Sequence, residues 1–166
     1  PSKAVKVNWT VVNGGTVPNA IAAAPRPFGD MRADDEKDFA AVEASLRERI
    51  KNHLIPDTTV DVKFGRLYPP LPFREQSLKA AQHAQKLYAE AGGTLKVATV
   101  STGGGTHAAY AAVKKTAPVI EGLGLRAFGS HSNDAEYVHV SSIEPRLYLL
   151  TRMVIDAANG LVPGVR

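Results

Sequence analysis

The chain has 166 residues, enough for one domain or two small ones, and its 44% hydrophobic and 22% charged residues are typical of a soluble globular protein. The net charge of +4 comes from scattered Lys and Arg rather than from a basic cluster, so nucleic acid is not an expected partner. No stretch is apolar enough to span a membrane and no secretory signal opens the chain, so we expect a soluble protein of the cytoplasm or the periplasm, with the sequence not deciding between the two.

The first 66 residues are expected to form strands and one helix. Apolar and polar residues alternate over residues 5–11, and a short strand is expected near residues 28–32 after an irregular alanine-rich segment. A helix follows, because apolar residues then recur at steps of three and four, and Pro56 closes it. Its apolar stripe consists of Phe39, Val42, Leu46, Ile50 and Leu54. Residues 59–64 alternate again as a further strand.

A proline-rich run at residues 67–73 cannot continue a sheet and marks a boundary between two units, 1–66 and 71–166. Beyond it, helices alternate with strands, which is typical of an α/β architecture. One helix is expected over residues 74–91, and a second is expected to begin after the glycine-rich sequence STGGGTH. A last helix is expected to begin at the capping-box pattern of Ser141 and Glu144 and to end near Gly160. The last helix carries an apolar stripe of Ile143, Leu147, Leu150 and Val154. Strands are expected over residues 94–100, 117–124 and 136–140.

The sequence STGGGTH places three consecutive glycines between an expected strand and an expected helix. Backbone N–H groups in such a turn can face an anion or a developing negative charge. No Gly-Lys-Ser or Gly-Lys-Thr follows, and the Gly-x-Gly-x-x-Gly fingerprint is absent, so a nucleotide site is disfavoured. A tight turn between closely packed elements is an equal alternative, and an anion-binding α/β domain is the weakest of the functional readings.

Metal binding would have to use His, Asp and Glu, because the chain has no cysteine. His131 is the best-placed histidine, since it lies in a loop of small and polar residues that can project into a cleft. Among ionic and amide groups, Arg32 and Arg66 end expected strands and could grip a carboxylate, while Asn19 could donate to a carbonyl or oxyanion. Taken singly, each of these residues is more typical of a solvated surface.

Three pieces of the second half together resemble a known family: STGGGTHAAYAA, PVIEGLGLRAFGSHSNDAEYV and RLYLLTRMVID. They are similar to the C-terminal part of the zinc-dependent aminoacylase and carboxypeptidase family of metallopeptidases, and within it to the bacterial glutamate carboxypeptidases. The upstream run VNWTVVNGGTVPNAIAAAPRPFGDMRADD resembles the lid or dimerisation domain of those enzymes. The resemblance implies that residues 1–66 form a partial lid of strands plus one helix, and residues 71–166 the C-terminal portion of the α/β catalytic domain.

The resemblance also implies roles for six residues. His131 matches a zinc ligand of the family, whose intact members hold two zinc ions, and no residue of this chain takes a catalytic role. Five residues match positions that bind substrate: Asn19, Arg32, Arg66, Thr102 and Gly105. The sequence departs from the family's pattern at two places near these substrate-binding positions. His107 stands where the family usually has aspartate, and the proline that follows the lid asparagine is displaced to Pro25.

The family's other zinc ligands and its glutamate base precede the region that this chain resembles. The resemblance therefore implies that the intact protein hydrolyses an amide bond of an N-acyl amino acid or a folate-type substrate, releasing glutamate. The chain alone is expected to be an inactive portion of that enzyme, because a catalytic zinc needs about three protein ligands. A homodimer is the expected assembly, and the alternative function is a dimerisation or interaction module without catalysis.

Overall fold

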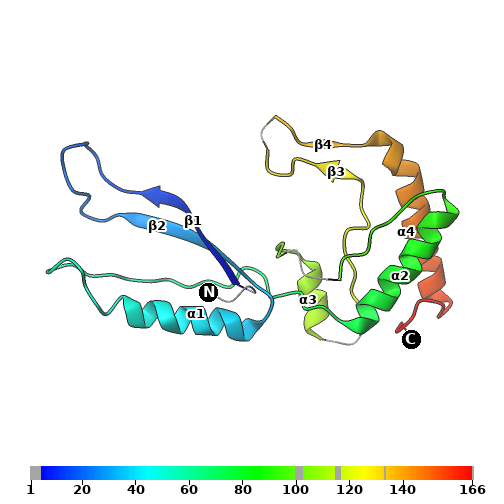
Figure 1. The fold of residues 1–166 in the computed structure, drawn as a ribbon, viewed down its shortest axis with the longest axis horizontal. Coiled ribbons are helices and arrows are strands. Elements are labelled where there is room, and N and C mark those ends of the chain that lie inside the picture. The colour runs from blue at the N-terminus through cyan, green and yellow to red at the C-terminus, as the bar shows by residue number, and fades with distance from the viewer. Residues whose placement is uncertain (1–4, 100–102, 115–116, 133, 166) are drawn as a thin grey trace. The chain divides into compact units, whose positions relative to one another are not determined.

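The structure is a computed structural model that describes residues 5–99, 103–114, 117–132 and 134–165. The chain divides into two compact units, one comprising Pro1–Pro72 with Thr102–Ala109 and the other Phe73–Ser101 with Tyr110–Arg166. Helices and two small antiparallel sheets make up both units, which confirms the mixed α/β class (Figure 1). The assignment of residues 1–66 to a partial lid and of 71–166 to a catalytic portion stays a prediction.

An antiparallel hairpin of β1 (Val5–Asn13) and β2 (Arg26–Ala33) begins the first unit. Both strands were predicted, and each is longer than the sequence pattern indicated. A bulge between Trp9 and Val11 shifts the register. Trp9 lies opposite Gly29, where an added Cβ would stand 3.2 Å from the indole carbon Cε3. The glycine therefore lets the large ring lie flat across the partner strand, as glycine in a strand often does where another group approaches closely.

Helix α1 (Glu36–Arg49) follows the hairpin and contacts β2. Its N-cap is Asp35, whose carboxylate accepts a hydrogen bond of 3.1 Å from the Lys37 backbone N–H. That bond holds the pKa of Asp35 below its ordinary value. The helix buries Phe39 and ends five residues earlier than its apolar stripe suggested, so Leu54 is 91% exposed. Hydrogen bonds to the third preceding carbonyl tighten the chain after residue 49, and the α-helical ladder stops there.

The predicted strand over residues 59–64 does not form. These residues run back along α1, and the described part of the chain offers them no strand partner (Figure 1). Phe64 instead packs its ring under the Arg66 guanidinium, 5.0 Å from the ring centre. The alternating pattern therefore identified an extended segment, but a strand also requires a hydrogen-bonded neighbour.

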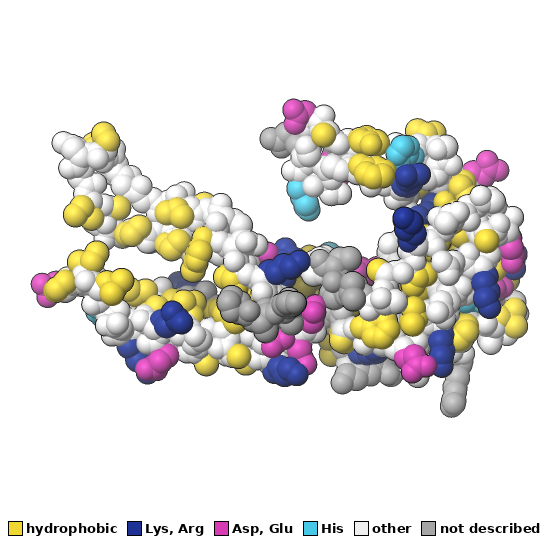
Figure 2. Space-filling view, viewed as in Figure 1, with side chains coloured by type: hydrophobic (Ala, Val, Ile, Leu, Met, Phe, Trp, Pro, Cys, Tyr) yellow, Lys and Arg dark blue, Asp and Glu magenta, His cyan; other side chains and the backbone are white. Residues whose placement is uncertain are grey.

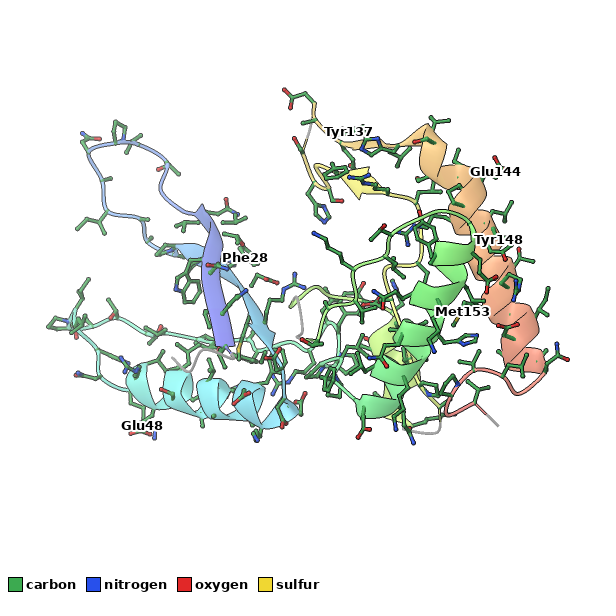
Figure 3. All side chains as sticks on the ribbon, turned by 45° about the vertical axis from the view of Figure 1, so that its right-hand side comes forward. Phe28, Glu48, Tyr137, Glu144, Tyr148 and Met153 are labelled. Atoms are coloured by element: carbon green, nitrogen blue, oxygen red, sulfur yellow. The ribbon has the colours of Figure 1, made fainter. Side chains whose placement is uncertain are left out.

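In the second unit, α2 (Glu75–Glu90) packs against α4 (Ile143–Ala158). Both helices were predicted. The core cluster between them consists of Ala84, Leu87, Tyr88 and Leu149, with Leu95, Ile120, Leu123 and Met153 packed against it. Met153 is labelled on α4 in Figure 3. Gly93, just past the end of α2, lies so close to the Tyr88 ring that any added Cβ would overlap it. This unit holds the largest buried apolar cluster of the described residues.

The short strands of the second unit differ from the prediction. Residues 94–99 and 117–124 contribute side chains to the core, yet in the described structure neither segment forms a strand. The expected strand at residues 136–140 is reduced to β4 (Tyr137–Val138), which pairs with an unpredicted strand, β3 (Ala127–Phe128). Apolar runs of this length predict burial better than they predict pairing, because the pairing partner lies elsewhere in the sequence.

The start of α4 also differs from the prediction. The N-cap is Ser142 rather than Ser141, and no side-chain capping bond forms there. A 3-10 turn, Val140–Ser142, precedes the helix instead, and the Ser142 hydroxyl donates to the His139 carbonyl at 2.6 Å while accepting from the Arg126 N–H at 3.1 Å. Ser142, at the start of α4, therefore forms hydrogen bonds to the residues that flank the β3–β4 hairpin.

The apolar stripe of α4 does not face the core. Leu149 is fully buried, whereas the four residues of the stripe are all exposed, Leu147 by 63% and Val154 by 69%. Ile143 and Leu150 complete this exposed stripe. Helix α4 therefore carries two apolar faces, and α2 covers one of them.

Candidate functional site

The glycine-rich turn packs against Arg32 within the first unit. Arg32 is the penultimate residue of β2, and residues 103–109 belong to the same compact unit despite their distance in sequence. A Cβ added to Gly105 would stand 2.8 Å from Arg32 Nη1 and 3.0 Å from Tyr68 Cδ2, and one added to Gly103 would stand 3.8 Å from Arg32 Cβ. The glycines thus allow a close approach of the turn to the arginine side chain, and the structure brings together two of the predicted site residues.

Arg32 is held on its own strand by Asp30. The Nε–H group donates to Asp30 Oδ2 at 2.7 Å, and both side chains are about half exposed. Residues two apart on a strand share a face, which explains why the two side chains meet. Sequence reasoning missed Asp30, although the Asp-x-Arg spacing on an expected strand was the signal that could have found it.

Arg66 is engaged by α1. Its Nε donates to Glu36 Oε1 at 2.8 Å and its Nη2 lies 3.5 Å from Glu43 Oε2. The guanidinium also lies 5.0 Å from the ring centres of Phe39 and Phe64. These contacts tie the extended segment that precedes Arg66 to α1, and a ligand carboxylate at Arg66 would compete with two glutamates.

Tyr68 and His107 border the glycine turn on its other side. Their rings meet edge to face with centres 5.3 Å apart, and Tyr68 also flanks Gly105. The cap of the short helix α3 (Ala108–Val113) is Thr106, whose hydroxyl accepts from the Ala108 N–H at 3.1 Å. Thr106 therefore caps α3, and the His107 imidazole contacts Tyr68. Neither Tyr68 nor Thr106 was identified from the sequence.

Two predicted site residues stand apart from this cluster. Asn19 is exposed in a turn of the loop between β1 and β2. Thr102 lies outside the described residues. The roles predicted for both residues stay predictions.

His131 lies in the loop between β3 and β4 of the second unit. It is exposed and has a φ of 68°, in the left-handed region that residues other than glycine rarely adopt. Gly129 has a φ of 70°, and its carbonyl accepts from the Ser132 N–H at 2.8 Å, closing a tight turn around His131. The turn therefore fixes the direction in which the Cα–Cβ bond of His131 leaves the backbone, and such strained backbone is common at functional sites.

Three aromatic rings stand at the base of the same hairpin. Phe128 and Tyr137 stack with centres 5.5 Å apart, and His139 meets both rings edge to face (Figure 3). The Arg126 guanidinium lies 5.5 Å from the Phe128 ring centre. His139, expected only as a strand residue, thus braces the loop that carries His131.

The described residues do not fit a zinc ion by themselves. Within residues 5–99, 103–114, 117–132 and 134–165, no three His, Asp or Glu side chains converge as metal ligands. Zinc in proteins takes three or four side-chain ligands. His131 would therefore need partners beyond the described residues in order to hold the metal that the sequence resemblance implies.

A separate polar network joins α2 to α4. His83 Nε2 lies 2.7 Å from Asp156 Oδ2, and the Asp156 side chain is buried. At the other end, Glu90 accepts from Tyr148 at 2.7 Å and from Arg152 at 2.8 Å. The hydrogen bond to Glu90 raises the pKa of the Tyr148 hydroxyl. These polar contacts join α2 to residues of α4 that lie outside its exposed stripe.

The comparisons with known proteins place the chain in a family. The sequence matches the peptidase family M20/M25/M40 over residues 3–156, so the chain belongs to that family. It is also 42% identical, over 159 residues, to Carboxypeptidase G2 of Pseudomonas sp. (strain RS-16). That match covers 96% of this chain and 38% of the relative, so the chain spans well under half the length of this curated protein.

A Gly105→Ala substitution tests the close approach of the glycine turn to Arg32. The new Cβ would overlap Arg32 Nη1 and Tyr68 Cδ2, so we expect the guanidinium to move and the Arg32 Nε–H resonance to shift in a nitrogen-15 NMR spectrum. Gly65→Ala is the matched control, because a Cβ at Gly65 meets nothing within 4 Å. An unchanged Arg32 resonance in Gly105→Ala would show that the turn does not touch the side chain.

Proposed function

We propose that this chain supplies the substrate-carboxylate grip and one zinc ligand of a metallocarboxypeptidase that hydrolyses an amide bond and releases a C-terminal glutamate. Family membership supports the peptidase class, and the 42% identity to a carboxypeptidase supports the C-terminal specificity. The observation that carries the proposal is the arrangement of Arg32, whose guanidinium lies over a glycine turn with its Nε already paired to a carboxylate.

In this proposal Arg32 binds the carboxylate of an N-acyl amino acid or a folate-type glutamate. A planar guanidinium can hold both carboxylate oxygens at once, which fixes the direction of the scissile bond relative to the protein. Asn19 donates its amide to the developing oxyanion, and Arg66 adds a second cation when it exchanges its glutamate partners for substrate. Gly105 and Thr102 line the same pocket.

His131 is one zinc ligand in this proposal, and the remaining ligands come from residues outside this chain. A bound zinc ion supplies an activated water for amide hydrolysis. The residues of this chain bind and orient the substrate rather than move its protons.

The purified 166-residue chain tests this division of labour. The chain is incubated with zinc and either N-acetyl-L-glutamate or a folate-type glutamate. We expect glutamate to be released no faster than in buffer without protein, because one histidine does not hold a catalytic zinc. Equilibrium dialysis should likewise show no tightly bound zinc. Metal-dependent release of glutamate by the chain alone would contradict the proposal.

A second candidate function is self-association, and the exposed surface favours it. The chain exposes 12688 Å², whereas two separate folded units of half its mass would expose together about 9,600 Å². Among the described residues the β1–β2 sheet has two strands, and Val7, Trp9 and Val11 on β1 are all exposed. Figure 2 shows hydrophobic side chains on the surface of this hairpin. Unpaired strand edges beside apolar side chains favour the addition of further strands.

Sedimentation velocity tests this second candidate. An interaction module should form a homodimer that a Trp9→Lys substitution weakens, since the charge would fall on the exposed face of the hairpin. A monomer at all concentrations would remove self-association as a function of this chain. None of the described helices is long and apolar enough to cross a bilayer.

A further inference from the structure

We propose that Asp30 is a positioning residue for the carboxylate grip. It holds Arg32 through Nε and leaves the end-on fork of Nη1 and Nη2 to receive the ligand carboxylate. The inference deepens the proposed function and rests on it for the identity of the ligand. The bond between Asp30 and Arg32 forms without a ligand.

The geometry around Arg32 shows restraint on two sides. On one side the Nε–H donates to Asp30 at 2.7 Å, a charge-assisted bond within a single strand. On the other side lies the glycine turn, where a Cβ added to Gly105 would stand 2.8 Å from Nη1. The guanidinium is therefore bonded at Nε and closely approached near Nη1.

A guanidinium can receive a carboxylate along its side, through Nε and one terminal nitrogen, or at its end, through Nη1 and Nη2. Asp30 occupies the side through Nε. In the described part of the chain, no other carboxylate is paired with Arg32. Arg66 differs, because two glutamates already take its Nε and Nη2. Arg32 is thus the arginine whose end-on fork is presented to a ligand.

Holding the side chain in advance lowers the entropic cost of binding. Ordering one side chain with many rotamers costs about 0.5–1.5 kcal/mol, which corresponds to roughly a two- to tenfold change in Kd. Asp30 also carries a negative charge, which by itself would repel a carboxylate ligand. If Asp30 positions Arg32, its loss should raise the Kd for the carboxylate ligand. If Asp30 mainly repels the ligand, its loss should lower that Kd.

The experiment follows the Arg32 Nε–H resonance of the nitrogen-15-labelled 166-residue chain while N-acetyl-L-glutamate is added. Positioning predicts that Asp30→Ala broadens or shifts the free Nε–H resonance and weakens binding by roughly two- to tenfold. Asp30→Asn retains an acceptor for Nε–H without the charge, so it should bind the ligand more tightly than Asp30→Ala does. Asp34→Asn is the matched control, because it removes a nearby exposed negative charge that has no ion pair among the described residues.

The two readouts separate this inference from the proposed function. An unchanged Nε–H resonance in Asp30→Ala, or tighter binding by that variant, would overturn the positioning role. If the resonance changes but neither the unmodified chain nor any variant binds the ligand, Asp30 does hold Arg32 and the carboxylate grip is wrong. Equal weakening by Asp30→Asn and Asp30→Ala would also overturn the positioning role, because Asp30→Asn retains an acceptor for the Arg32 Nε–H group.

Discussion

Replacing His131 by alanine is expected to abolish most of the activity of an enzyme that contains this chain. The assay uses a chimera in which the chain replaces the matching 38% of Carboxypeptidase G2. Loss of a residue that merely supports a metal ligand typically costs 10- to 100-fold in metal affinity or activity, so loss of the ligand itself should cost at least about 100-fold. Zinc content and the rate of glutamate release are measured together.

Two controls make the His131 result specific. His53→Ala removes an exposed histidine beyond the end of α1 and should leave both zinc content and rate unchanged. Ser132→Ala leaves the backbone turn around His131 in place, because the bond to Gly129 comes from the Ser132 backbone N–H. Full activity and full zinc content in the His131→Ala chimera would show that this histidine is not a ligand.

Replacing Leu149 by alanine is expected to give the largest loss of stability. Leu149 is fully buried in the cluster that joins α2 to α4, and a leucine-to-alanine change at such a site typically costs about 2–5 kcal/mol of unfolding free energy. Circular dichroism during urea denaturation measures the loss. The single tryptophan, Trp9, lies on β1 of the other unit, so its fluorescence reports that unit separately.

Leu147→Ala is the matched comparison on the same helix. Leu147 is 63% exposed, so its truncation should change the unfolding free energy by less than about 0.5 kcal/mol. Similar losses from the two substitutions would mean that the stripe of α4 is covered in solution, and would point to an associated form of the chain. An unshifted unfolding transition in Leu149→Ala would contradict the core assignment.

The helices of this chain could be predicted from the sequence because their signals are local. The periodicities of α1, α2 and α4 gave their positions, with α1 extended too far past residue 49. Segments 59–64, 94–99 and 117–124 carried equally clear apolar patterns, yet in the described structure they lack the neighbours that would make them strands. Pairing depends on distant sequence, which a local pattern does not contain.

The site was predictable in its members more than in its geometry. Arg32 and Gly105 came from the resemblance, and the structure brings them together. The pairing of Arg32 with Asp30, the competition of Glu36 and Glu43 for Arg66, and the contact of Tyr68 with His107 all depend on side-chain positions. The stripe of α4 was misleading for a related reason, since apolar spacing does not say which of two apolar faces a neighbouring helix will cover.

The preference for a free carboxylate tests the central claim most directly. The chimera is assayed on an N-acyl glutamate with a free α-carboxylate and on the same substrate with that group converted to a carboxamide, with and without Arg32→Ala. We expect the unmodified chimera to favour the free acid by about 10- to 100-fold in kcat/KM, the effect of a hydrogen bond to a charged group, and Arg32→Ala to remove that preference. An equal preference in both proteins would contradict the assignment of Arg32 as the carboxylate grip.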